Sequence, residues 1–157
     1  MTTATLTIRL AALEDGPALA MLCAQLGYPT SPQAVQQRLQ HIHGLSDHAV
    51  YVAKHPEAGV IGWVHVYVTD LLETDRQAEI GGLVVSEVHR QTGAGKLLMQ
   101  YAEQWARTQA CAAVCLRSNI IREGAHAFYR KIGYREIKRQ LTFRKLLSET
   151  TAGQATG

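Results

Sequence analysis

The sequence predicts a mixed α+β fold, in which a twisted and mostly antiparallel sheet of about seven strands is flanked by about four helices. Short runs of β-branched and aromatic residues are interspersed with longer runs whose apolar residues recur at helical spacing. In order, the runs predict a strand, two helices, three strands, a helix, a strand, a helix and two strands. The length of 157 residues and the 46% hydrophobic content suit one domain. We expect it to span residues 1–147, with a disordered tail at 148–157.

The first strand and the first two helices follow from changes of period near the N-terminus. Residues 5–10 (TLTIRL) alternate apolar with polar side chains, as a half-buried strand does. The next run has leucines at helical spacing behind Pro17, which suits the first turn of a helix. Ser31 followed by Pro32 is typical of the start of a second, short helix that reaches Ile42.

A hairpin and a third strand occupy the middle of the chain. Residues 49–53 and 60–68 are rich in β-branched and aromatic residues, and the sequence HPEAG between them suits a turn. A polar loop at 69–76 leads to a further strand at 78–85, which two adjacent glycines interrupt. Glycines inside a strand usually mark a bulge or the close approach of another backbone or a ligand.

The C-terminal half is predicted to contain two helices and three strands. A helix of about four turns begins at the glycines of Gly93-Ala94-Gly95, and residues 112–116 follow it as a buried strand. Another helix begins at Glu123 and ends at a glycine, and two closing strands are expected at 134–137 and 141–145. The long helix therefore connects two parallel strands, and ligands favour the carboxyl ends of such strands.

The charge and cysteine content exclude several function classes. The net charge of +3 is spread among acidic residues, which does not indicate a nucleic-acid partner and is compatible with a pocket for a polyphosphate cofactor. Three cysteines (Cys23, Cys111 and Cys115) lie in apolar stretches without metal-ligand spacing, so we expect reduced core residues and no metal. The N-terminus lacks the pattern of a signal peptide, and no apolar run has membrane-spanning length. We expect a cytoplasmic protein without a membrane partner.

The most informative motif lies between the strand that contains the glycines and the long helix. It consists of Arg90, Gln91, Thr92, Gly93, Ala94, Gly95 and Lys96. Free N–H groups at a helix N-terminus attract anions, glycines let the backbone approach them, and the two basic side chains add charge. The motif therefore predicts a pyrophosphate cradle. The alternative is a tight turn that needs glycine for its geometry alone. The motif is neither a Walker loop nor a complete dinucleotide-binding motif.

Two motifs in this half of the chain resemble those of the GNAT superfamily of acetyl-CoA-dependent N-acetyltransferases. The sequence IGGLVVSEVHRQTGAGKLL resembles the central strand, Q/R-x-x-G-x-G/A loop and helix of that family. The later sequence SNIIREGAHAFYRKIGY resembles the next motif, in which an asparagine precedes a helix that carries phenylalanine-tyrosine. The specific motifs lie between Ala78 and Tyr134, and the N-terminal half agrees in its order of elements. The resemblance implies the GNAT fold.

The resemblance also implies a binding site for acetyl-CoA. The cofactor contacts that it implies come from Leu83, Val84, Val85, Asn119, Phe128 and the loop from Arg90 to Lys96. The strand end would pair with the pantetheine arm and supply an N–H for the acetyl oxygen, while Tyr129 would protonate the departing thiolate. Tyr129 has an alternative role in packing, because it lies on the apolar stripe of its helix.

A primary amine is mostly ammonium at neutral pH and must lose a proton before it can attack the thioester. Glu79, on the strand before the loop, matches the catalytic glutamate of the family's histone acetyltransferases and is the leading candidate for the base. Alternatively, Glu79 has no catalytic role and is simply a solvated residue where the chain enters the strand. Asp70, Glu73 and Asp75, in the preceding loop, are the other candidates for the base. Alternatively, these carboxylates attract a cationic substrate. Among possible acceptor contacts we single out Tyr28, Asp70 and Glu73.

Other candidates for chemistry carry less weight. His65, His89 and His126 are isolated in sequence, and we interpret all three as surface or supporting residues. Cys115 lies in an apolar strand, so we expect it to pack there and the acetyl group to be transferred directly, without a covalent acyl-enzyme.

These observations lead to one function and two alternatives. The sequence predicts an N-acetyltransferase that moves the acetyl group of acetyl-CoA to a primary amine of a small molecule. A protein or peptide N-acetyltransferase and a non-catalytic acyl-CoA-binding regulator are the alternatives. Dimers are common in the family, so a homodimer is an open expectation. The amine, and the use of other acyl-CoAs, stay open.

Overall fold

The computed structural model describes residues 5–118 and 122–148. The chain forms two compact units, Met1–Arg117 and Ser118–Gly157, which are described in turn. Residues 149–157 of the expected tail lie outside the described residues, and the expected single domain over 1–147 stays a prediction.

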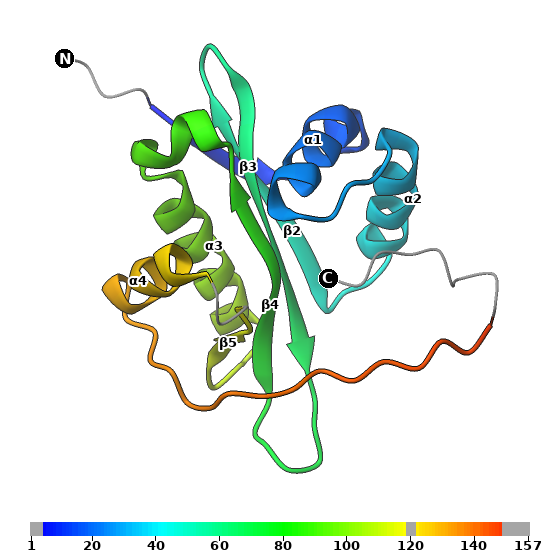
Figure 1. The fold of residues 1–157 in the computed structure, drawn as a ribbon, viewed down its shortest axis with the longest axis vertical. Helices are drawn as coiled ribbons and strands as arrows, with labels where there is room; N and C mark the ends of the chain where they lie inside the picture. The colour runs from blue at the N-terminus through cyan, green and yellow to red at the C-terminus, as the bar shows by residue number, and fades with distance from the viewer. Residues whose placement is uncertain (1–4, 119–121, 149–157) are drawn as a thin grey trace. The chain divides into compact units, whose positions relative to one another are not determined.

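The first unit is built on a five-stranded sheet whose order follows the chain (Figure 1). Its strands are β1 (Thr7–Leu10), β2 (His48–His55), β3 (Gly59–Thr69), β4 (Gln77–Val85) and β5 (Val114–Leu116). The first four strands pair antiparallel, whereas β4 and β5 pair parallel. The predicted parallel crossover is therefore confirmed, as is the hairpin turn between β2 and β3.

Helices cover both faces of this sheet. They are α1 (Gly16–Leu26), α2 (Pro32–His43) and α3 (Ala94–Thr108), with 3₁₀ turns η1 (Leu13–Asp15) and η2 (Glu87–Thr92). Figure 1 shows α1 and α2 on one side of the sheet and α3 on the other. The expectation of a short second helix was wrong, since α2 has 12 residues and α1 has 11. The Ser31 side chain stabilises the start of α2 by accepting a hydrogen bond of 3.1 Å from the backbone N–H of Ala34.

The alternation of β3 divides the core into two layers. Val64 and Val66 are fully buried, and the ideal Cβ position at Gly62, on the same face, lies 3.3 Å from Leu98 of α3. Residues at the intervening positions of β3 face α1 and α2, where Trp63 packs against a cluster of buried apolar residues from β2 and both helices. The sheet thus has two different faces, which the period-two pattern of its strands requires.

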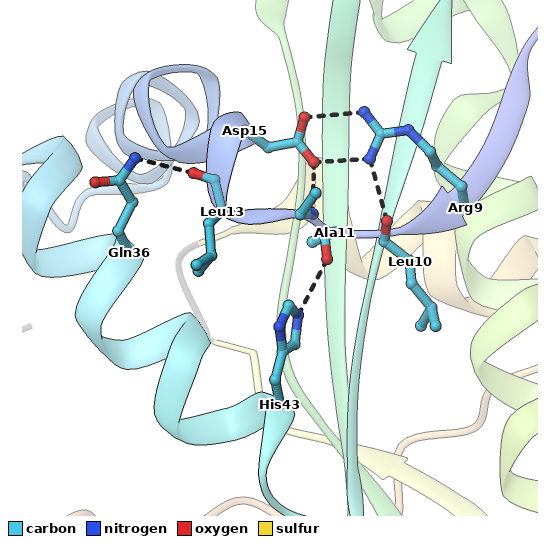
Figure 2. Close-up of polar contacts among 8 residues, drawn as sticks. Arg9, Leu10, Ala11, Leu13, Asp15, Gln36 and His43 are labelled. Atoms are coloured by element: carbon cyan, nitrogen blue, oxygen red, sulfur yellow. Dashed lines mark hydrogen bonds and ion pairs between the residues drawn. The ribbon is translucent and has the colours of Figure 1, made fainter.

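A charged pair holds the junction between β1 and α1 (Figure 2). Both guanidinium Nη atoms of Arg9 donate to the carboxylate of Asp15, at 2.7 and 2.9 Å, and the Ala12 N–H donates to the same carboxylate at 2.8 Å. Helix α2 is joined to this junction by Gln36, whose side chain donates to the Leu13 carbonyl, and by His43, whose ring lies 3.0 Å from the Ala11 carbonyl oxygen. Asp15 is buried, so its charge is compensated where water cannot reach it.

The second unit contains α4 (Glu123–Lys131), whose start confirms the prediction. Gly133 follows it with φ 103°, a left-handed conformation that suits glycine at the end of a helix. The two closing strands at 134–137 and 141–145 are a wrong prediction, because no strand includes residues 134–146. A strand needs a partner for its backbone groups, and six of the twelve residues from 134 to 145 are charged, which weakens the apolar alternation that predicted pairing.

We predict that Asp15→Asn lowers the free energy of unfolding at neutral pH by about 1–3 kcal/mol. The lower half of that range is expected, because Arg9 is 35% exposed and partly solvated. Burial raises the pKa of Asp15, but the hydrogen bonds from Arg9 and Ala12 outweigh it, so that the pKa is lowered overall. The stabilisation is therefore present above the unfolded-state pKa of about 3.9 and is lost as the pH falls through the folded-state pKa.

Urea unfolding followed by tryptophan fluorescence measures this effect, since Trp63 and Trp105 both lie in the first unit. The matched control is Glu14→Gln, which removes the same charge from the exposed neighbour and should change stability by less than about 0.5 kcal/mol. Equal stability of Asp15→Asn and Glu14→Gln at pH 7, or a difference that persists in strong acid, would contradict this account.

Candidate active site

A bulge in β4 opens the region in which the sequence motif lies. His65 of β3 is opposite Gly82, and the next residue, Val66, is opposite Ile80, so Gly81 is an extra residue on β4. The bulge predicted from the two glycines is therefore confirmed. A bulge bends its strand and increases the local twist.

The two glycines also make room for side chains of β3. A Cβ atom at Gly82 would lie 2.6 Å from the Trp63 ring, and one at Gly81 would lie 3.1 Å from His65 Nδ1 and 3.2 Å from Tyr67. Because the ring of Trp63 is rigid, Gly82 is the position where any larger residue would displace its neighbour. The close approach at these glycines is thus made by side chains of β3.

The sheet opens between β4 and β5 immediately after the bulge. Strand β5 pairs with Ala78, Glu79 and Ile80 only. Beyond Ile80, the described residues provide no strand partner on that side of β4, whereas the other side stays paired with β3 as far as Val85. Residues 81–85 therefore present backbone N–H and C=O groups at the carboxyl end of a parallel pair.

Helix α3 begins next to this opening, after the predicted glycine turn. Gly93 is its N-cap residue with φ 84°, and no side chain forms a cap hydrogen bond there. The Ala94 N–H donates to the Thr92 hydroxyl at 3.4 Å, and that hydroxyl donates to the His89 carbonyl at 2.7 Å. Gly93 is thus required by backbone geometry, while the helix N-terminus carries a partial positive charge. Arg90 and Lys96 are both exposed beside it.

A polar cluster lies on the face of the sheet opposite α3. It consists of His48, His65, Tyr67 and Glu79. Tyr67 is opposite His48 of β2 and Glu79 of β4, and His65 lies two residues before Tyr67, so all four lie on the same face. His48 Nδ1 is 2.9 Å from His65 Nε2, and the His48 ring stacks on Tyr67 at a centroid distance of 5.2 Å. Burial and the neighbouring His48 lower the pKa of His65 to about 4, so its imidazole is neutral at pH 7.

Glu79 is held in this cluster by an ion pair. Its carboxylate lies 3.5 Å from Arg117 Nε, and its side chain is 15% exposed, against 80% for Arg117. The alternative of a solvated glutamate at a strand entrance is therefore wrong. Burial and the charge of Glu79 raise the pKa of Tyr67, although Arg117 opposes that effect.

Sequence reasoning missed most of this cluster. His65 was interpreted as an isolated residue, and His48 and Tyr67 were not considered. The signal was present in VIGWVHVYV, since the period of a strand places Trp63, His65 and Tyr67 on one face. His48 could not be found in that way, because its contact depends on the register between β2 and β3.

The three residues singled out as acceptor contacts do not come together. Tyr28 is 58% exposed and lies three residues after Gln25. The Gln25 side chain accepts a hydrogen bond from the Glu87 N–H, just beyond the C-terminal end of β4. Asp70 and Glu73 precede the other end of β4, and Asp70 forms an ion pair of 2.8 Å with Arg76. Nine residues of extended strand span about 30 Å, so Tyr28 lies toward one end of β4 and the two acidic residues toward the other.

The second motif lies in the other unit and is described by itself. Phe128 and Tyr129 of α4 are half-buried, and their rings meet edge to face at 5.3 Å. Burial raises the pKa of the Tyr129 phenol, although Arg122 lowers it, so the group stays protonated at neutral pH. Asn119 lies outside the described residues.

Three further findings concern metals, cysteines and membranes. Within residues 5–118 and 122–148, no group of three or more histidine, cysteine or acidic side chains could hold a metal ion. Cys23, Cys111 and Cys115 are free, as expected of reduced residues, but they are half-buried and lie at the border of the core. No helix in the described part of the chain is both long and apolar enough to span a bilayer.

Comparison with known proteins agrees with this geometry. The chain is 41% identical over 56 residues to the uncharacterized N-acetyltransferase YhdJ of Bacillus subtilis (strain 168), a match that covers 35% of this chain and 39% of that protein. It is 27% identical over 73 residues to the aminoglycoside N(6')-acetyltransferase type 1 of Acinetobacter haemolyticus, covering 46% and 50% of the two chains. The matches thus span half or less of these curated relatives.

The fold is shared with a solved structure, that of AAC(6')-Iy in complex with the bisubstrate analog CoA-S-monomethyl-acetylneamine. The TM-score is 0.80 at 18% identity, over 91% of this chain and 99% of that one. At this identity the likeness concerns the fold alone, which is the GNAT fold. The model of the acetyltransferase (GNAT) family matches residues 13–134, more than three quarters of the chain. The motifs, the fold and this match together show that the chain belongs to the acetyltransferase (GNAT) family.

Proposed function

We propose that this protein is an N-acetyltransferase that transfers the acetyl group of acetyl-CoA directly to a primary amine of a small molecule. The opening between β4 and β5, beside the glycine-capped start of α3, is the observation that carries the proposal. It offers backbone groups that have no strand partner among the described residues, and a helix N-terminus, within one continuous segment, residues 81–96.

The unpaired side of β4 suits the pantetheine arm of coenzyme A. That arm contains two amide groups, which can pair with Leu83, Val84 and Val85 in the manner of an added strand. One N–H at this strand end would donate to the acetyl oxygen as negative charge develops on it.

The start of α3 suits the diphosphate of the same molecule. Its N-cap residue, Gly93, has no side chain to cap the helix, and the helix dipole favours an anion there. Arg90 and Lys96 add positive charge at the rim, where the diphosphate stays in contact with water.

Glu79 is the proposed general base. The ammonium gives a proton to its carboxylate, directly or through water, and the neutral nitrogen then forms a bond to the acetyl carbon. Neutral His65 and the Tyr67 hydroxyl, on the same face of the sheet, offer hydrogen bonds that orient the amine. The carbon–sulfur bond breaks, and Tyr129 gives its proton to the leaving thiolate, a role that rests on the family motif.

A small-molecule amine is the proposed acceptor. The similarity to an aminoglycoside N(6')-acetyltransferase supports a small amine over a peptide, and the half-buried polar cluster supplies groups that can bind ammonium and hydroxyl groups. A screen of acetyl-CoA consumption over polyamines, aminoglycosides, amino acids and peptides tests it. Turnover with a small amine is expected, and turnover with peptides alone would overturn the choice.

We predict that Arg90→Ala combined with Lys96→Ala raises the Kd for acetyl-CoA roughly tenfold or more, which is about 1.4 kcal/mol. The physical reason is the lost attraction for the diphosphate. Calorimetry with S-acetylpantetheine, which lacks the diphosphate, should give the same Kd for variant and wild type. Arg107→Ala, at the opposite end of α3, is the control and should bind acetyl-CoA as the wild type does. An equal loss of affinity for both ligands would argue against the cradle.

We predict that Glu79→Gln lowers kcat/KM for an accepted amine by about 100-fold or more at neutral pH, because the base is removed. Arg117→Gln abolishes the same ion pair but keeps the carboxylate, so it should retain most of the activity. If the two variants lose activity equally, the role of Glu79 is to hold Arg117 and the base lies elsewhere.

We predict that Tyr129→Phe lowers kcat by at least about tenfold and leaves the Kd for acetyl-CoA unchanged, since only proton donation to the thiolate is lost. Tyr134→Phe removes a hydroxyl from the same unit and is the control, with kcat unchanged. Parallel loss of kcat and of cofactor affinity in Tyr129→Phe would indicate a packing role. Acetyl-CoA binding without turnover in the wild type, with every amine tested, would favour a regulator.

A further inference from the structure

His48 and His65 share one hydrogen bond that can run in either direction. His48 Nδ1 lies 2.9 Å from His65 Nε2, and the two rings stack with their centroids 5.2 Å apart. A neutral imidazole has one N–H and one lone pair, so one ring donates and the other accepts. The direction of this hydrogen bond decides which nitrogen of His65 carries its proton.

The other nitrogen of His65 lies beside the bulge. Nδ1 is the atom nearest to the ideal Cβ position at Gly81, at a distance of 3.1 Å, and Gly81 is exposed. Gly81 is also the first residue of β4 beyond its pairing with β5. Glu79, the proposed base, lies two residues earlier on β4 and on the same face as His65. Nδ1 of His65 is therefore placed where an amine that approaches Glu79 can meet it.

The charge of Asp47 favours one direction of the hydrogen bond between the histidines. Asp47 Oδ1 lies 4.0 Å from His48 Nε2. A carboxylate attracts a proton on the nitrogen that faces it and repels a lone pair there. Neutral His48 therefore carries its proton on Nε2, and its Nδ1 accepts from the Nε2–H of His65. This arrangement leaves the lone pair of His65 on Nδ1, next to Gly81.

Two further observations indicate that this lone pair is available and held in place. Burial and the neighbouring His48 lower the pKa of His65 to about 4, so the ring is neutral at pH 7 and keeps a lone pair. The His48 ring is fixed by a second contact, because it also stacks on Tyr67 with a centroid distance of 5.2 Å and an interplanar angle of 14°.

We propose that His65 Nδ1 accepts a hydrogen bond from the ammonium group of the substrate, and that His48 is a positioning residue that keeps His65 in the Nε2–H tautomer. The inference rests on the proposed function, because it assigns a further contact to the amine that Glu79 deprotonates. Glu79 and His65 then offer two acceptors on one face of the sheet to an ammonium group, which has three N–H donors. In the other tautomer, an N–H on Nδ1 would face the ammonium and oppose its binding.

Nitrogen NMR of isotope-labelled protein at neutral pH measures the tautomer directly, because ring nitrogens with and without a proton differ widely in chemical shift. The wild type should show His65 with a proton on Nε2 and none on Nδ1. In His48→Leu the Nε2–H loses its acceptor, whereas an N–H on Nδ1 can reach water beside exposed Gly81, so the proton should move to Nδ1. His48→Asn supplies an amide oxygen near the place of the His48 Nδ1 and should keep the wild-type tautomer. A proton on Nδ1 of His65 in the wild type would overturn the proposal.

Kinetics with an amine that the wild type acetylates test the contact with the substrate. His48→Leu and His65→Leu should raise KM for that amine about tenfold, as expected for one hydrogen bond to a charged group, while kcat changes less than about threefold. His48→Asn should keep KM near the wild-type value, and His41→Leu, which removes an exposed histidine of α2, is the control with unchanged KM. Equal KM values for His48→Leu and His48→Asn, or a loss confined to kcat, would rule out the positioning role. Failure of the inference is thus seen as the wrong tautomer or an unchanged KM in an active enzyme, and failure of the enzymatic proposal as a wild type without turnover.

Discussion

The bulge at Gly81 is the constraint on which the rest of the site depends. One extra residue on β4 bends the strand, and pairing with β5 ends at Ile80 while pairing with β3 continues to Val85. The half of β4 nearest α3 therefore has one side without a strand partner in the described part of the chain, at the carboxyl ends of two parallel strands. The bulge also fixes which side chains of β3 lie over β4, because Trp63 and His65 occupy the space that a Cβ at Gly82 or Gly81 would need.

This arrangement separates two tasks between different parts of the same unit. Backbone groups at the end of β4 and the start of α3 are suited to the thioester carrier, since their hydrogen bonds do not depend on side-chain identity. Side chains on the face opposite α3 are suited to the acceptor, with Glu79 in an ion pair with Arg117 and His65 neutral at pH 7. Such a division is consistent with one fold serving different amines, because the acceptor side can vary while the backbone site is kept.

The parts of the fold that could be predicted from sequence are those set by local patterns. Gly81 and Gly82 inside an apolar strand indicated the bulge, and Gly93 before the regular spacing of α3 indicated where that helix begins. The Glu79 position was indicated, but its burial and its ion pair with Arg117 depend on the pairing of β4 with β5. The same limit explains the missed contact of His48 with His65 and the unrecognised pair of Arg9 with Asp15, since both require the chain to be folded. The closing strands were predicted from composition, which cannot tell whether a partner strand is present.

The most direct test of the account is hydrogen exchange of the backbone amides in residues 81–96, with and without coenzyme A. Amides at Leu83–Val85 and at the start of α3 should exchange more slowly in its presence, while those of β1 and β2 should not change. Heat of binding without added protection in these two segments would contradict the account, as would the absence of any binding.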